Sequence, residues 1–273
     1  MTQTPLLTDR QTLNRRRTRA ARDPALFLHE TARDEVQDRL AMVNRSFTAP
    51  AVVTPFPQVW ESLLPDVRTL SDDDTLDLTE GAHDLVVHAL ALHWANDPVG
   101  QIIQCRRALR PDGLFLCLTF GGDTLKELRA ALGQAEIEIT GGLSPRILPM
   151  GEIRDLGGLL QRAGLALPVA DAIPLTVSYQ SALHLMRDLR AMGETNALHA
   201  RLRQPTRRAI LLRASEIYAQ TFALEDGRVP ASFEIVTLTG WAPDASQQKP
   251  LRPGSAAHSL AQALGTQEKP LKD

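Results

Sequence analysis

Two near-continuous apolar runs constrain the fold of this chain more than any other feature. The first covers residues 84–92 and is interrupted only by His88, and the second covers residues 114–120. Such runs are typical of parallel strands that are covered by helices on both faces. Between them, Asp97 and Pro98 supply the capping carboxylate and the first-turn proline that favour the start of a helix. A strand–helix–strand unit of this kind predicts a right-handed crossover and hence a parallel α/β sheet.

The rest of the chain predicts further helices and strands around this unit. An amphipathic helix is expected over 26–47, because apolar residues recur there at helical spacing. Thr124 with Glu127 predicts a capping box at the start of a helix over 125–138. The Arg-rich stretch 15–22 is expected to form a short exposed helix whose charges face either solvent or an acidic partner. The other expected helices are 60–64, 152–164, 182–192 and 205–222, and the other expected strands are 51–53, 67–70, 167–177 and 232–241.

The composition argues against several classes of protein. The 273 residues are 43% hydrophobic and carry a formal net charge of -2, which argues against broad binding to nucleic acid or to anionic membranes. No run approaches the roughly 18–20 apolar residues of a membrane span, so we expect no membrane insertion. Cys105 and Cys117 lack the spacing of a metal site and are expected to be reduced core residues of a cytoplasmic protein. The preference for Arg over Lys is typical of a GC-rich bacterial genome.

The stretch 84–97 resembles the fourth-strand region of class I S-adenosylmethionine-dependent methyltransferases. More narrowly, it is similar to the branch that contains the malonyl-carrier-protein methyltransferase of biotin synthesis and the mitochondrial complex I assembly factor five. The resemblance runs through an ordered set of motifs over most of 84–241, and it is closer to the assembly-factor side. These motifs are 109–113, 120–125, 141–145, 155–157, 162–164, 188–196 and 229–233.

The resemblance implies an α/β fold with a doubly wound, Rossmann-like methyltransferase sheet whose last strand is antiparallel. It implies S-adenosylmethionine as the cofactor and a protein substrate or partner, such as a complex I subunit. It also divides the chain into a helical extension over 1–47, a core over 48–178, an inserted helical lid over 179–228 and a last core strand over 229–243. Segment 244–273 is rich in Gln, Lys, Pro, Gly and Ser, so we expect it to be disordered.

This chain departs from the family in the loop after the first strand. Where the family keeps an acidic residue and a Gly-x-Gly turn, the sequence reads Thr54-Pro55-Phe56-Pro57. Glycines let the backbone approach the cofactor and its N–H groups donate to the cofactor carboxylate, whereas proline has no N–H and Phe56 is large. The passage from this loop to Asp84 is about 30 residues, so at least one strand–helix pair is expected to be shortened or missing.

Ligands of open α/β sheets bind beyond the carboxyl ends of the strands, which selects the candidate site residues. The cofactor-binding candidates are Thr54, Phe56, Asp73, Asp74 and Leu90. The triplet 72–74 either holds the ribose hydroxyls or forms an acidic turn. The cleft or substrate candidates are His93, Trp94, Gly121, Gly122, Ser144 and Arg146.

Four of these cleft candidates also have a purely structural interpretation, whereas Arg146 has no obvious structural role and favours a loop that faces a substrate or partner. Trp94 could cover the end of the sheet while His93 makes a local hydrogen bond, and the two glycines could serve only the turn. The sequence assigns no catalytic residue and no metal ligand. It contains no HExxH, P-loop or paired-cysteine motif.

Three functions are compatible with these observations. The first is an S-adenosylmethionine-dependent methyltransferase that acts on a protein or on a carrier-bound carboxylate. The second is a non-catalytic descendant, a pseudoenzyme with altered or lost cofactor binding, that binds a partner during complex I assembly. The third is a related enzyme that modifies a protein side chain, such as by the arginine hydroxylation associated with the assembly-factor relatives.

Overall fold

The computed structural model describes residues 6–248 and 260–266. The chain divides into two units, Met1–Pro243 and Asp244–Asp273. In the second unit the described part contains the short helix α9 (Leu260–Ala263). Most of the segment predicted to be disordered lies outside the described residues.

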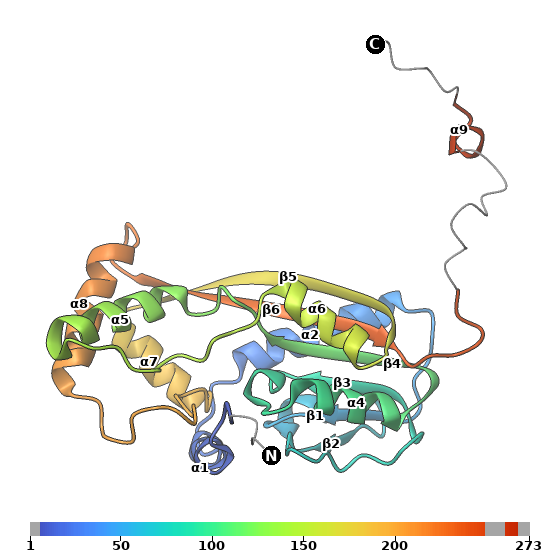
Figure 1. Cartoon of the computed structure of the whole chain (residues 1–273), viewed down its shortest axis with the longest axis horizontal. Coiled ribbons are helices and arrows are strands. Elements are labelled where there is room, and N and C mark those ends of the chain that lie inside the picture. The colour runs from blue at the N-terminus through green and yellow to red at the C-terminus, as the bar shows by residue number, and fades with distance from the viewer. Residues whose placement is uncertain (1–5, 249–259, 267–273) are drawn as a thin grey trace, which may run out of the picture. The chain divides into compact units, whose positions relative to one another are not determined.

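The first unit is built on a six-stranded sheet with the order β2-β1-β3-β4-β6-β5 (Figure 1). The strands β2, β1, β3 and β4 are mutually parallel, and β6 pairs antiparallel with both β4 and β5. The predicted α/β class and the antiparallel last strand are therefore confirmed. The strands are β1 (Pro50–Val53), β2 (Arg68–Leu70), β3 (His83–Ala89), β4 (Leu109–Phe120), β5 (Ala166–Tyr179) and β6 (Val229–Trp241).

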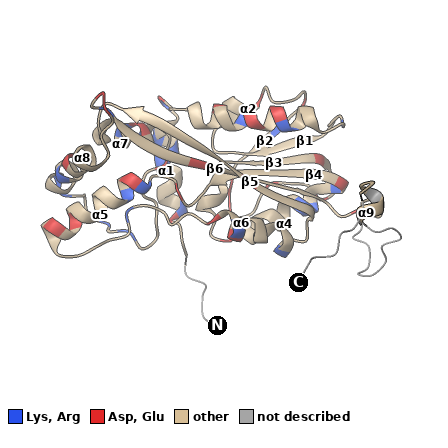
Figure 2. Cartoon of the chain, turned by 90° about the horizontal axis from the view of Figure 1, so that it is seen from above, with Lys and Arg blue, Asp and Glu red and all other residues tan. Residues whose placement is uncertain are grey.

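Helices cover both faces of the sheet because alternate residues of the central strands are apolar on both sides. On β3, Leu85 and Val87 face a core that also contains residues of α2 (Phe27–Met42). The intervening Val86 faces a second core, to which α4 (Pro98–Ala108) and α6 (Ile153–Arg162) contribute. Seen from above, α2 lies on one side of the strands and α4 and α6 on the other (Figure 2).

The remaining helices gather at the end of the sheet where the parallel strands finish (Figure 1). Two of them, α5 and α8, pack against each other, and α1 packs on α7. Leu13 of α1 joins a small separate core with Trp94 and Leu148. A 3-10 turn, η1 (Leu92–Trp94), follows β3 into this region. The helices here are α1 (Arg10–Ala20), α5 (Lys126–Thr140), α7 (Ala182–Ala191) and α8 (Arg208–Phe222).

Two expectations for local structure were wrong, and one was right. The expected helix over 60–64 is reduced to α3 (Pro57–Trp60). Only α3 and the three-residue β2 lie between β1 and β3, as the short passage predicted. The capping box is absent from α5, because Thr124 bonds the backbone of Glu234 while the Glu127 carboxylate accepts from Ser232. Both side chains therefore attach α5 to β6 instead of closing its first turn.

Candidate functional site

A cleft of about 600 Å³ lies at the carboxyl ends of β1 and β2. We call it the cofactor-side cleft, because it follows the strand ends at which this fold binds ligands. One wall is α1, which contributes Asn14, Arg17 and Thr18. The opposite wall comes from the loop at 54–57 and from the residues that follow β2, including Asp72 and Asp73.

The loop after β1 has no free N–H group to offer a ligand. The N–H of Thr54 donates to the carbonyl of Leu70 at 2.9 Å. The N–H of Phe56 donates to the Thr54 hydroxyl at 3.2 Å. Pro55 and Pro57 have no N–H to donate. All four positions of the loop are therefore either internally bonded or lack a donor.

Two of the cofactor candidates lie in the core instead of the cleft. The side chain of Phe56 is 1% exposed and packs edge-on against His29, with ring centroids 5.0 Å apart. Leu90 is also 1% exposed and belongs to the same core. Because Phe56 fills core volume, it does not obstruct the cleft as its size suggested. A small residue at position 56 would leave a cavity under α2.

The buried acidic residue of the triplet is Asp72, and it is held by two arginines of α1. Arg17 Nη1 lies 2.6 and 2.8 Å from the two oxygens of Asp72, and Arg10 Nη1 lies 3.0 Å from Oδ2. Burial alone would raise the pKa of Asp72, but the two guanidinium groups hold it well below its ordinary range. Asp73 and Asp74 are exposed and lie 4.0 Å from Arg10.

Sequence reasoning had left open whether the Arg-rich stretch meets an acidic partner. The structure answers part of this question, because Arg17 of that stretch, together with Arg10 before it, meets an acid of its own chain. The helix was predicted to be exposed, but Arg17 is buried in α1. The spacing of seven residues places both arginines on one face of a helix, two turns apart. That spacing is visible in the sequence and groups the two arginines, but it does not identify Asp72 as their partner.

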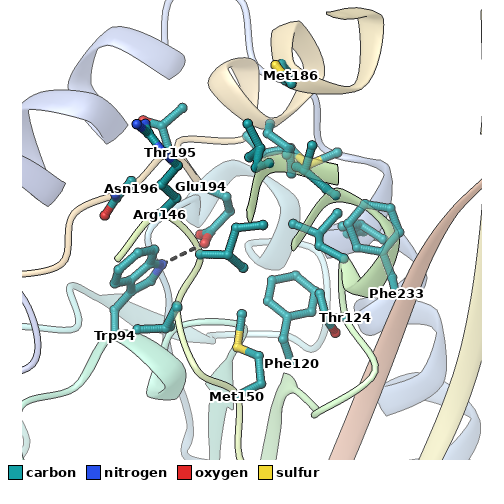
Figure 3. A pocket seen from close by; sticks show the side chains of 18 residues that line it. Trp94, Phe120, Thr124, Arg146, Met150, Met186, Glu194, Thr195, Asn196 and Phe233 are labelled. Atoms are coloured by element: carbon teal, nitrogen blue, oxygen red, sulfur yellow. Dashed lines mark hydrogen bonds between the residues drawn. The ribbon is translucent and has the colours of Figure 1, made fainter. Parts of the chain in front are cut away.

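A smaller cavity, of about 150 Å³, lies beneath α7 and beside α5 (Figure 3). We call it the lid pocket. Most of its lining is apolar and includes Phe120, Met150, Met186, Met192 and Phe233. Its polar side chains include Glu194, Arg146 and Asn196. An apolar cavity with a few convergent polar groups is the usual form of a ligand site.

Glu194 places a charged carboxylate in this apolar pocket. Its Oε2 accepts a hydrogen bond from Trp94 Nε1 at 2.6 Å (Figure 3) and a second from His93 Nε2 at 3.1 Å. Burial would raise the pKa of Glu194, but the interaction with His93 is the main cause that lowers it instead, with help from Arg17 and Trp94. Its Oε1 has no hydrogen-bond partner among the described residues, and is not among their fully buried unpartnered atoms.

The predicted pair His93 and Trp94 therefore does meet a polar partner, but from a distant part of the sequence. Glu194 stands 100 residues beyond Trp94, just after α7. In the sequence this glutamate lies within the motif 188–196, just beyond the expected helix over 182–192, and it was not among the predicted site residues. Nothing in its local pattern distinguishes it from a helix-terminal surface residue.

The other cleft candidates have structural partners. A side chain at Gly121 would lie 2.2 Å from the Glu234 carboxylate, and one at Gly122 would lie 2.6 Å from the Glu152 carboxylate. Gly121 is crowded by Val236 Cγ2 as well, at 2.7 Å, which favours glycine there, whereas at Gly122 only the flexible Glu152 carboxylate would have to move. Ser144 and Arg146 both bond Glu136, with Arg146 Nη2 at 2.6 Å from Oε1. The Arg146 guanidinium is the main cause that lowers the pKa of Glu136 to about 2.

Three further observations concern metal sites, cysteines and membrane spans among the described residues. They contain no group of three or more His, Cys, Asp or Glu side chains placed to hold a metal ion. Cys105 and Cys117 are buried and unpaired, and burial raises the pKa of both thiols. No helix within the described ranges is both long and apolar enough to cross a membrane.

Comparison with known proteins agrees with this arrangement. Residues 50–117 match the model of a methyltransferase domain. The chain is 40% identical over 198 residues to a protein of Danio rerio named "Arginine-hydroxylase NDUFAF5, mitochondrial", over 72% of this chain and 61% of the relative. It is 36% identical over 184 residues to the malonyl-[acyl-carrier protein] O-methyltransferase of Laribacter hongkongensis, over 67% of this chain and 59% of the relative.

The chain thus spans about three fifths of the length of these curated relatives. Among solved structures, the YcgJ protein of Bacillus subtilis gives a TM-score of 0.48 at 12% identity, over 79% of this chain and 100% of that one. A likeness at this level supports no conclusion about function. From the sheet order, the methyltransferase-domain match and the two groups of sequence relatives, this chain is an α/β protein that resembles the class I methyltransferase branch containing arginine hydroxylases and malonyl-carrier-protein methyltransferases.

Proposed function

We propose that this chain binds a partner protein through the lid pocket and does not bind S-adenosylmethionine in the manner of the family. The observation that carries the proposal is the charged Glu194 carboxylate, which presents an unpartnered oxygen to an apolar, methionine-lined cavity. A cavity of this form matches a long apolar stem with a cationic head. The bound group is an arginine side chain of the partner, and a complex I subunit is the first candidate for that partner.

The residues of the cofactor-side cleft do not fit the cofactor. The loop at 54–57 supplies no free N–H for its carboxylate, so the donor-rich turn of the family has no counterpart here. The buried acid that would accept the ribose hydroxyls, Asp72, is already bonded by Arg10 and Arg17. Displacing these arginines would leave charges without partners in a buried place, which is costly.

Calorimetric titration of the full chain with S-adenosylmethionine and with S-adenosylhomocysteine tests the first half of the proposal. We expect no saturable heat up to about 1 mM ligand, because neither the loop nor Asp72 offers a free hydrogen-bonding group. The Arg10→Gln/Arg17→Met double variant, which frees Asp72, serves as a comparison. Micromolar binding to the unmodified chain would show that the cofactor is held by groups other than these.

Replacing Glu194 with glutamine tests the second half. N-acetyl-L-arginine methylamide is expected to bind the unmodified chain, and the neutral citrulline analogue to bind much more weakly. The Glu194→Gln variant keeps the shape of the side chain but removes its charge, so arginine binding should weaken about 10- to 100-fold. Titration calorimetry measures both affinities.

The matched control is Glu216→Gln, which removes an exposed carboxylate from α8. It should leave arginine binding unchanged. Equal arginine affinities for Glu194→Gln and the unmodified chain would contradict the proposed pocket.

The arginine-hydroxylase relatives favour a second function, in which the bound arginine is also modified. Mass spectrometry of complex I subunits that co-purify with the tagged chain separates the two. A bound subunit with unmodified arginines supports a non-catalytic binding role. A gain of one oxygen atom on an arginine, lost in the Glu194→Gln variant, would support the modifying enzyme.

A further inference from the structure

A second polar cavity, of about 380 Å³, shares Arg146 and Asn196 with the lid pocket. It is bounded by α1, by the loop at 144–146 and by the segment that leads into α8. Among the described residues its lining includes four arginines and a single carboxylate, that of Glu136. We call it the arginine cavity after Arg16, Arg146, Arg201 and Arg207.

Two of these arginines are paired and two are not. Arg146 bonds Glu136, and Arg201 Nη2 lies 2.9 Å from the carboxylate of Asp9. The side chains of Arg16 and Arg207 make no hydrogen bond or ion pair within the described part of the chain. The cavity therefore carries positive charge that its own residues leave uncompensated.

Burial and neighbouring like charges make the position of Arg16 electrostatically unfavourable. The side chain is partly buried on α1. Burial lowers its pKa, and the nearby charges of Arg201 and Arg19 lower it further, while Asp9 opposes them. A guanidinium group that loses hydration beside like charges gains from any anion that reaches it.

The start of α8 points to the same ligand. This 15-residue helix begins after Arg207 with no side chain bonded to its first N–H groups. Arg207 and Ile210, which flank that first turn, both line the cavity. In that turn the N–H of Ile210 donates to the Arg207 carbonyl at 3.0 Å, so the free N–H groups are those of Arg208 and Ala209. Free N–H groups at the positive end of a helix dipole attract anions.

We propose that the arginine cavity binds a phosphate group. Two unpaired guanidinium groups, each with a fork of donors, match a doubly charged anion with three free oxygens. A carboxylate would be satisfied by one of them. The phosphate comes either from a small phosphate ester or from a phosphorylated side chain of a partner protein. The two cavities share Arg146 and Asn196, but the phosphate proposal does not rest on arginine binding in the lid pocket.

Titration calorimetry of the full chain with inorganic phosphate, against sodium chloride at equal ionic strength, tests this site. We expect saturable phosphate binding that Arg16→Gln weakens at least about tenfold. Arg207→Gln should weaken it as well. The matched control is Arg15→Gln, which removes the same charge from an exposed position of the same helix and should change the affinity by less than about twofold.

Equal weakening by Arg15→Gln and Arg16→Gln would overturn the proposal, because it would show attraction to general charge and not a site. Heats indistinguishable from those of chloride would overturn it too. The thermal midpoint of each variant without phosphate shows whether the fold is intact. A phosphoserine peptide that binds tighter than inorganic phosphate identifies a protein as the source, and equal affinities identify a small ester.

Discussion

Replacing Asp72 with asparagine is expected to lower the free energy of unfolding by about 3–5 kcal/mol. The carboxylate is buried and bonds Arg17 and Arg10. Asparagine keeps the size of the side chain but leaves the buried Arg17 without its ion-pair partner, while Arg10 keeps only the exposed Asp73 and Asp74 at 4.0 Å. Arg17 already has two nitrogens, Nε and Nη2, without a partner among the described residues, so it has no alternative acceptor nearby. Chemical denaturation at neutral pH measures the change.

The neighbouring carboxylate provides the control. Asp73→Asn removes an exposed charge 4.0 Å from Arg10 and should cost no more than about 0.5 kcal/mol. In a double-mutant cycle, Arg17→Met combined with Asp72→Asn should destabilise the chain less than the sum of the single changes. A loss below about 1 kcal/mol for Asp72→Asn would mean that the ion pair is not formed in solution.

Helix α1 contributes to two separate sites, and the ion pair belongs to only one of them. Arg17 points toward Asp72 at the cofactor-side cleft, whereas Arg16 lines the arginine cavity. Consecutive residues of a helix project about 100° apart, so one helix can serve two sites at once. Loss of α1 would therefore open the cofactor-side cleft and remove the proposed phosphate site together.

The sheet could be predicted from the sequence because its signals are local. The apolar run at 84–92 and the cap at Asp97 are visible within a few residues, and Asp97 does accept a hydrogen bond from the N–H of Gly100. The capping box failed for the opposite reason. Thr124 and Glu127 fit a local motif, but Glu234 and Ser232, more than 100 residues away, bond them instead. Tertiary partners outcompete local ones when they are also buried.

Contacts between distant residues limited the prediction of the candidate site even more than that of the fold. Its position at the strand ends followed from the fold class, and Thr54 and Trp94 do line the two cavities there. The charge pairs did not follow, because Arg17 and Asp72 stand 55 residues apart and Trp94 and Glu194 stand 100 apart. A single sequence does not show which distant charged residues are in contact. Phe56 was wrongly predicted to lie in the cofactor site, because the sequence shows the size of its side chain but not that the side chain points into the core.

Acidification from pH 6.5 to 4.5 is expected to lower the free energy of unfolding by roughly 2–3 kcal/mol per pH unit. Burial lowers the pKa of His29 to about 3 and that of His88 to about 4. For His29 a contact favours the neutral ring as well, because its Nδ1 accepts from Trp60 Nε1 at 3.4 Å. The contact between His88 Nε2 and Gln101 Oε1, 2.8 Å apart, raises the pKa of His88 instead, but burial outweighs it.

The direction follows from where each state takes up protons. An unfolded histidine is protonated as the pH falls through about 6.5, whereas the two folded side chains stay neutral until about pH 3 or 4. Between these values the unfolded chain binds more protons, so acid favours unfolding and the full stability is present above pH 6.5.

The variants His29→Gln and His88→Gln test this prediction. Each should reduce the slope of the free energy of unfolding against pH by about 1.4 kcal/mol per pH unit, whatever its effect on stability at pH 7. Denaturation curves across the range measure it, with the exposed His184→Gln as the control for loss of an imidazole. If neither variant changed the slope, the acid sensitivity would have to arise from carboxylates. Glu136, with its pKa lowered to about 2, would then move the loss of stability below pH 4.5.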